Sequence, residues 1–158
     1  MSGEKPDCSA SVPKTLSKKT KTKATIIPKA RLIPIPPRLF TEETATAING
    51  ISIADADDQG ANLTTRLQVT VGVVNVTLSG AATISTGSNG SGDLTILGSE
   101  ADINATLATL TYTGNTDVVG TAADTLTVTT DDQGNTGAGG AQQDVDTVQI
   151  DITAVNDA

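Results

Sequence analysis

Apolar residues recur at every second position in several short segments between residues 51 and 153. This alternation is typical of a β-strand that buries one face and exposes the other. It is clearest in residues 63–71, 74–78 and 148–152, and Gly-, Asn- and Asp-rich turns such as residues 88–92 separate the segments. The pattern predicts about seven short strands packed face to face as an all-β sandwich.

One segment has a helical pattern instead. Ser99 is a good N-cap, and Asp102 stands three positions later in an arrangement similar to a capping box. Ile103, Leu107 and Leu110 follow at spacings of four and three, which places them on one face of a helix. The sequence therefore predicts a short helix over about residues 100–108.

The composition limits how the domain reaches stability. The chain of 158 residues has one Phe, one Tyr and no Trp, so we expect a thin core of Val, Ile, Leu and Ala. Cys8 is the only cysteine, which excludes an intrachain disulfide. We therefore expect a secreted domain of this kind to gain rigidity from bound cations.

Charge divides the chain into two parts. Residues 1–40 contain nine of the ten basic residues and all six prolines, with a net charge of +7. Residues 41–158 contain one basic residue, Arg66, against sixteen carboxylates, with a net charge of −15. The sequence predicts a disordered, basic, Pro-rich tail or spacer at 1–40 and a folded domain at 41–158.

The tail allows two partner classes besides a plain spacer role. Arg31, Pro34 and Pro37 have the spacing that some SH3 grooves accept, although a stiff spacer is the simpler interpretation. A lysine cluster could contact nucleic acid or anionic lipid, but it has no interleaved aromatic or Arg residues, so a solvated tail is favoured. The cluster comprises Lys14, Lys18, Lys19, Lys21 and Lys23.

The residue types of the domain argue against catalysis. Residues 41–158 contain no His and no Cys, and therefore no imidazole base, thiolate nucleophile or soft metal ligand. Carboxylate pairs can hydrolyse glycosides, but such enzymes usually hold sugars on aromatic side chains, and this domain has one Tyr. We expect no enzymatic activity.

Carboxylates gather in two turns with the shared sequence Asp-Asp-Gln-Gly followed by an Asn. The first contains Asp55, Asp57, Asp58 and Asn62, and the second contains Asp131, Asp132 and Asn135. Such loops offer the carboxylate, amide and carbonyl oxygens that Ca²⁺ prefers. They also suit tight turns and solubility without any metal. Spacing alone leaves both interpretations open.

Five segments together resemble the cadherin-like repeats of large bacterial surface adhesins, over residues 41–158. Residues 39–44 resemble the start of such a repeat, and residues 51–57 its second strand and Asp-Ala-Asp loop. Residues 131–134 resemble its late acidic loop, residues 150–158 its last strand and linker, and residues 101–112 a signature of the bacterial repeats. The resemblance implies an immunoglobulin-like Greek-key sandwich with Ca²⁺ at both ends, where neighbouring repeats meet.

The resemblance also implies a set of ligands for Ca²⁺. One end should offer Asp55, Asp57 and Asp131, with Asn62, and the opposite end should offer Glu42, Asn156 and Asp157. Several positions depart from the family pattern: Ala154 and Ala158 replace acidic or amide linker residues, and no Asp-Arg-Glu triplet is present, although Asp117 and Asp124 lie in that region. We therefore expect half-sites with weak affinity, about 10⁻⁴–10⁻³ M as in extracellular modules.

These features predict a calcium-binding structural or adhesive repeat of a bacterial cell-surface or secreted protein. Its partners would be neighbouring repeats of the same array and another cell surface, and its export signal would lie outside this sequence. The alternative is a stand-alone interaction protein, in which residues 1–40 bind an anionic partner and the sandwich is a metal-free carrier. A third interpretation is that residues 1–40 come from a misassigned gene start.

Overall fold

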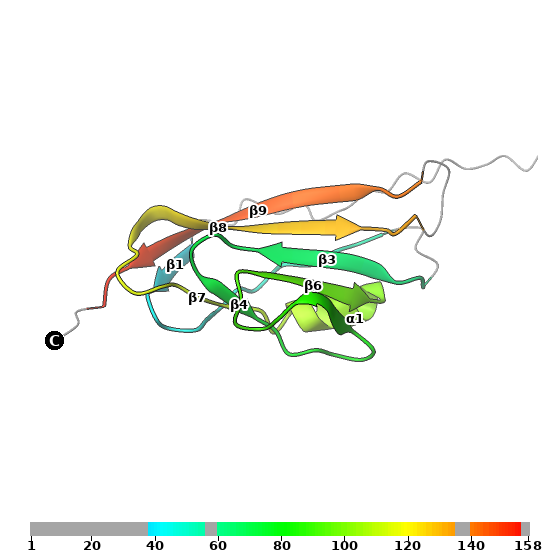
Figure 1. Cartoon of the computed structure of the whole chain (residues 1–158), viewed down its shortest axis with the longest axis horizontal. Coiled ribbons are helices and arrows are strands. Elements are labelled where there is room, and N and C mark those ends of the chain that lie inside the picture. Colours follow the sequence, from blue (N-terminus) through cyan, green and yellow to red (C-terminus); the bar gives the residue numbers. More distant parts are fainter. Residues whose placement is uncertain (1–37, 56–59, 135–139, 156–158) are drawn as a thin grey trace, which may run out of the picture.

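The alternating segments form two β-sheets packed face to face, so the predicted sandwich is confirmed (Figure 1). The computed structural model describes residues 38–55, 60–134 and 140–155. Its strands are β1 Arg38–Thr41, β2 Thr46–Ala47, β3 Leu63–Gln68, β4 Val73–Asn75, β5 Thr83–Gly87, β6 Asp93–Gly98, β7 Thr111–Thr113, β8 Gly120–Asp131 and β9 Gln143–Thr153. Its helix is α1 Glu100–Leu107.

The larger sheet has the strand order β1-β9-β8-β3-β6-β5, and the smaller has the order β2-β7-β4. Every pair is antiparallel except β1 with β9, which run in the same direction with Arg38 opposite Ile150 and Thr41 opposite Thr153. The chain crosses between the sheets several times, for example from β3 to β4 and from β7 to β8. Strands that are consecutive in the sequence therefore often belong to different sheets.

The core lies between the sheets and is mostly aliphatic, as expected. Leu67, Leu126 and Ile150 of the larger sheet are fully buried, and they alternate with exposed or half-buried neighbours. The two aromatic side chains meet edge to face across the core, with the ring centroids of Phe40 and Tyr112 5.3 Å apart and their planes at 73°. This geometry is favourable for aromatic pairs. Phe40 thus fixes β1 to the smaller sheet.

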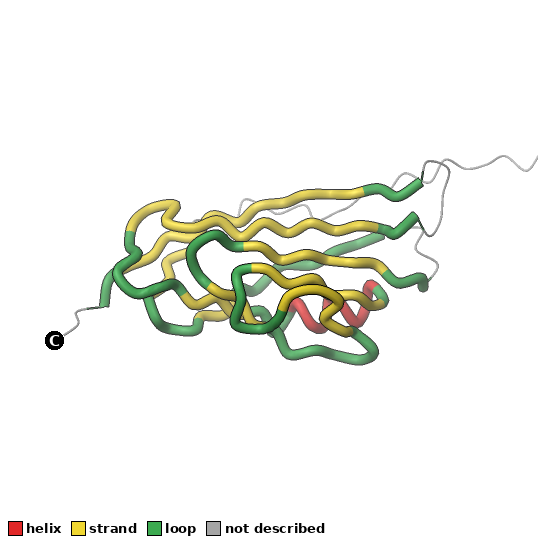
Figure 2. The backbone as a smooth tube through the Cα atoms, viewed as in Figure 1, coloured by secondary structure: helices red, strands yellow, loops and turns green. Residues whose placement is uncertain are grey.

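The predicted helix is confirmed. Ser99 caps α1, because its hydroxyl oxygen accepts a hydrogen bond from the backbone N–H of Asp102 (3.2 Å). The predicted stripe of Ile103, Leu107 and Leu110 is completely buried, although Leu110 lies just beyond the last helical turn. Helix α1 packs at one end of the sandwich, beside β6 (Figure 2).

Residues 51–53 differ from the prediction. Their alternation indicated a strand, and Ile51 and Ile53 are indeed buried, but they belong to no β-ladder. The side chain of Asn104 in α1 replaces the missing neighbour: Ile53 N donates to Asn104 Oδ1 (2.8 Å) and Asn104 Nδ2 donates to Ile53 O (2.9 Å). The predicted burial of Ile51 and Ile53 is therefore confirmed. The hydrogen-bond partner of the Ile53 backbone is a side chain of the helix instead of a neighbouring strand.

The described residues form nine strands, more than the seven or so predicted. Three of them were not predicted: β1, whose first three residues fell within the predicted tail at 1–40, β2, which has only two residues, and β5. β5 is a mostly exposed edge strand whose Thr-Ile-Ser-Thr-Gly sequence contains one large apolar residue and so gives no alternation signal. Edge strands are held by their neighbour rather than by burial, which explains why the spacing of apolar residues does not reveal β5.

Helix α1 also secures the loop that follows β4. Ser79 N donates to Thr106 Oγ1 (3.0 Å), and Ala81 N donates to a carboxylate oxygen of Asp102 (3.3 Å). The polar side chains of α1 therefore bind backbone on two sides, at Ile53 and at residues 79–81. The helix closes the end of the smaller sheet.

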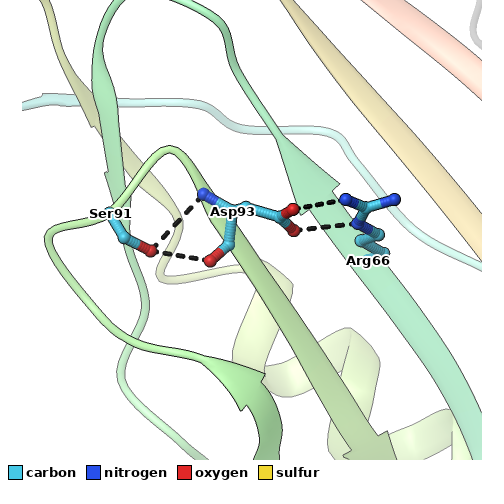
Figure 3. A network of polar contacts seen from close by, with 3 residues as sticks. All are labelled: Arg66, Ser91 and Asp93. Atoms are coloured by element: carbon cyan, nitrogen blue, oxygen red, sulfur yellow. Dashed lines mark hydrogen bonds and ion pairs between the residues drawn. The ribbon is translucent and has the colours of Figure 1, made fainter.

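The outer face of the larger sheet is polar. Its one ion pair among the described residues joins Arg66 on β3 to Asp93 on β6, with two contacts between the guanidinium and the carboxylate (Figure 3). The Ser91 hydroxyl donates to the backbone oxygen of Asp93 (2.7 Å) at the start of the same strand. Because both charged side chains are almost half exposed, we expect this pair to contribute little to stability.

Candidate functional site

The acidic candidates lie at opposite ends of the sandwich. We call one end the D-A-D pole, defined by Asp55, Asn62, Glu100 and Asp131. We call the other end the Glu42 pole, defined by Glu42, Glu43, Asp117 and Val155. The chain leaves β9 at the Glu42 pole, beside the end of β1 (Figure 1).

The strand register places the D-A-D pole residues at one end. Asn62 directly precedes β3, in which Thr64 stands opposite Asp131 of β8. Asp55 reaches this end through α1, because its backbone N–H donates to Glu100 Oε2 (2.8 Å). Glu100 was not among the predicted site residues. The sequence does place Glu100 directly after the Ser99 cap, as the first residue of the predicted helix.

The Asp-Asp-Gln-Gly turn after β8 is held by its own carboxylates. Asp131 accepts hydrogen bonds from Gln133 N (2.7 Å) and from the side-chain amide of Gln143 (2.7 Å). Asp132 is buried and accepts from Gly134 N (2.9 Å) and Gln142 N (2.7 Å). The two aspartates therefore differ: Asp132 builds the turn, whereas half-exposed Asp131 stays closer to solvent.

The Glu42 pole is organised around a buried carboxylate. Glu42 follows β1 and is 2% exposed. Its Oε1 accepts a hydrogen bond from Val155 N (2.8 Å), and its Oε2 accepts one from Asp117 N (2.8 Å). Each carboxylate oxygen has a second lone pair, so these contacts leave acceptor capacity. Glu42 thereby joins the end of β1, the turn before β8 and the segment after β9.

The two aspartates considered near the missing Asp-Arg-Glu triplet have separate roles. Asp117 lies at the Glu42 pole in a left-handed turn (φ 62°), where its backbone N–H binds Glu42. Asp124 is buried in β8, and its Oδ2 accepts hydrogen bonds from Gly72 N (2.9 Å) and from the Tyr112 hydroxyl (3.0 Å). Of these two aspartates, Asp117 is therefore the exposed one at this pole, and Asp124 is buried.

Asp124 is a structural carboxylate. Burial opposes its ionisation, but the backbone N–H groups of Gly72, Thr70 and Thr125 bind its ionised form and lower its pKa below the ordinary value of 3.8. Burial and the neighbouring Asp124 carboxylate raise the pKa of Tyr112, which therefore stays protonated and keeps donating. This network ties β8 and β7 to the loop that follows β3.

A second carboxylate pair was not predicted. Asp144 and Asp146 stand two residues apart on β9, on the same face as buried Val148 and Ile150. Burial and the neighbouring Asp144 raise the pKa of Asp146. The pair continues the inward face of β9 beyond the apolar core, toward the D-A-D pole. Its signal was the replacement of apolar by acidic residues within an otherwise regular alternation.

The donor set at both poles has suitable chemistry for Ca²⁺, because every candidate ligand is an oxygen. Within residues 38–55, 60–134 and 140–155, however, no three acidic side chains gather closely enough to hold a metal ion. Asp57, Asn156 and Asp157 lie outside the described residues. The described carboxylates thus supply only part of the six to eight or so oxygens that Ca²⁺ takes.

Searches of protein-family models, curated proteins and solved structures return no match to this chain. The described part of the chain also holds no helix with the length and apolarity needed to cross a membrane.

Proposed function

We propose that this sandwich is a structural repeat of a calcium-stabilised bacterial surface adhesin, serving as a spacer in a tandem array. The observation that carries the proposal is the direction of the chain. Because β1 and β9 are parallel, the chain runs toward the Glu42 pole in its first described strand and again in its last. First and last described strands that point toward the same end of the sandwich suit head-to-tail stacking, in which the D-A-D pole of one copy meets the Glu42 pole of another.

The distribution of charge supports a cation between such copies. Both poles present carboxylates, and the described domain has Arg38 and Arg66 as its basic side chains. Two acidic ends repel one another unless a cation lies between them. Glu42, Asp117, Asp55, Asp131 and Glu100 are the residues that would contribute oxygens, and the neighbouring copy would complete each ligand set. Adhesion then belongs to the whole array, and this module contributes length and stiffness.

The test is thermal unfolding of the full chain with Ca²⁺, with Mg²⁺ and with EDTA. A weak half-site with a Kd of about 10⁻⁴–10⁻³ M stabilises the fold by about 1.4–2.7 kcal/mol at about 10 mM Ca²⁺. We expect the melting temperature to rise by several degrees in Ca²⁺ and by less in Mg²⁺, which demands stricter octahedral geometry. Equal melting temperatures in Ca²⁺ and EDTA would refute the proposal and leave a metal-free carrier.

Two substitutions locate the effect. Asp131→Asn and Asp117→Asn each remove a charge at one pole, and we expect each to reduce the Ca²⁺-dependent increment. Asp93→Asn is the matched control, because Asp93 stands opposite Gln68 in the middle of the larger sheet and is paired with Arg66. It should change the starting stability slightly and leave the increment intact.

A further inference from the structure

The parallel pairing of β1 and β9 determines how the sandwich responds to tension along the chain. Tension pulls β1 backward from its start and pulls β9 forward from its end. Because the two strands are neighbours and point the same way, these forces slide one strand along the other. All the hydrogen bonds of the pair then carry load at once. In an antiparallel pair pulled from its open end, the bonds break one after another.

Glu42 and its neighbours extend this pair beyond the last ladder residue. Glu42 N donates to Thr153 O (3.2 Å), and the Thr153 hydroxyl donates to Phe40 O (3.0 Å). The Glu42 carboxylate then accepts from Val155 N (2.8 Å), two residues past the end of β9. Since Glu42 is 2% exposed, water cannot readily replace these bonds, and a hydrogen bond in a buried site is stronger than one in water.

The end of β1 is also fixed to the rest of the fold. Phe40 is 1% exposed and packs edge to face on Tyr112 of the smaller sheet. Glu42 Oε2 accepts from Asp117 N (2.8 Å), and Glu43 N donates to Gly114 O (3.1 Å). Sliding β1 along β9 therefore requires Phe40 to leave the core and these contacts to break together.

We propose that β1 and β9, closed by Glu42, form a mechanical clamp that makes this module resistant to force applied along the chain. The biological use of the clamp rests on the proposed role as an array spacer, because an array transmits tension through each repeat. The mechanical property itself follows from the strand geometry and needs no bound cation.

The test is single-molecule force spectroscopy of the full chain in EDTA, pulled through marker domains fused at its two ends. We expect one major rupture that releases about 40 nm of chain, the length of the whole sandwich. The comparison pulls the same protein across the sheet, through thiol handles at Thr86→Cys on β5 and Thr147→Cys on β9 in a Cys8→Ser background. Both positions are exposed, and this direction peels strands apart instead of sliding them.

We expect the rupture force along the chain to exceed the force across the sheet by roughly two-fold, because bonds loaded together share the force. Equal or lower force along the chain would overturn the clamp. Because the measurement is made in EDTA, failure of calcium stabilisation leaves this result unaffected, and the two proposals can fail separately.

Glu42→Gln tests the closing residue. The amide places an N–H₂ group against a backbone donor, so we expect roughly ten-fold faster unfolding at constant force along the chain. Glu43→Gln is the matched control, because the exposed Glu43 side chain accepts from the Thr116 hydroxyl outside the β1–β9 pair. The rate across the sheet should change little in either variant. If Glu42→Gln accelerates unfolding equally in both directions, the residue stabilises the fold generally and does not close the clamp.

Discussion

Replacing Asp124 with Asn should be among the most damaging single changes in this domain, although it alters side-chain shape very little. Asp124 is buried, and its two oxygens accept hydrogen bonds from the loop after β3, from its own neighbour in β8 and from Tyr112. All of these partners are donors. An Asn side chain replaces one acceptor oxygen with an N–H₂ donor, so one half of the site must place donors against donors.

The size of the effect follows from the contacts. An amide nitrogen at the Oδ1 position faces the backbone N–H groups of Thr70 and Thr125, and at the Oδ2 position it faces those of Val71 and Gly72. In either orientation two backbone donors lose their acceptor. Each buried donor left without a partner costs about 1–3 kcal/mol, so we expect a loss of about 2–6 kcal/mol. The lower half of that range applies if the amide nitrogen takes the Oδ1 side, where the bonds are only partly buried.

The assay is chemical unfolding followed by far-ultraviolet circular dichroism, with calorimetry as a second measurement. In a domain of this size about 2 kcal/mol corresponds to a fall in melting temperature of about 8 °C. Asp93→Asn makes the same chemical change in the exposed pair with Arg66 and should cost no more than about 1 kcal/mol. A loss below about 0.5 kcal/mol for Asp124→Asn would refute the reasoning, since that is the range of ordinary surface substitutions.

The same carboxylate predicts a pH dependence. The pKa of Asp124 is lower in the folded protein than its ordinary value of 3.8. Its contribution to stability is therefore complete above that value and is lost as the pH falls through the folded-state pKa. The stability difference between the wild type and Asp124→Asn should accordingly be constant near neutral pH and shrink in strong acid. A difference that grew on acidification would contradict the assignment.

Two further substitutions probe the core and the second carboxylate pair. Gly72→Ala should cost about 1–3 kcal/mol in chemical unfolding, because a Cβ at this position would lie 2.4 Å from a ring carbon of Tyr112; unchanged stability would show that the loop after β3 can move freely. Asp146→Asn should raise stability at neutral pH, because burial and Asp144 raise the pKa of Asp146 and so disfavour its ionised form in the folded state. In the wild type, protonated Asp146 contributes its full stability below pH 3.8, and this contribution is lost as the pH rises through the folded-state pKa. The advantage of the variant should therefore disappear in acid melts. An advantage that persists there would point to a cause other than charge.

Much of the fold could be predicted from the sequence because its signals are local. The cap at Ser99 and the stripe that follows it lie within one short segment, and they define α1 almost to the residue. Alternation in β3, β8 and β9 likewise identifies the buried faces. Residues 51–53 show where this reasoning stops. Alternation reveals which side chains are buried, but the partner of the backbone depends on a residue such as Asn104, 51 positions away.

The candidate site was harder to predict for the same reason. Glu42 was identified through a resemblance, whereas its contact with Val155 joins residues 113 positions apart and has no local signal. The distinction between Asp117 and Asp124 required the structure, because both are aspartates near the start of the same strand. Burial among backbone donors makes one of them structural, and a left-handed turn at the pole exposes the other.

Helix α1 has a consequence for the tandem array proposed above. Adjacent copies at high local concentration are at risk of joining through open sheet edges during folding, which leads to misassembly and aggregation. Here the polar side chains of α1 bind backbone at Ile53 and residues 79–81, where unpaired peptide groups would otherwise be offered to a neighbour. The edge strand β5 is interrupted by a register shift between Ile84 and Thr86, which makes it a poor template for another strand. In the proposed array, the helix and this bulge would hinder pairing between the sheet edges of neighbouring copies.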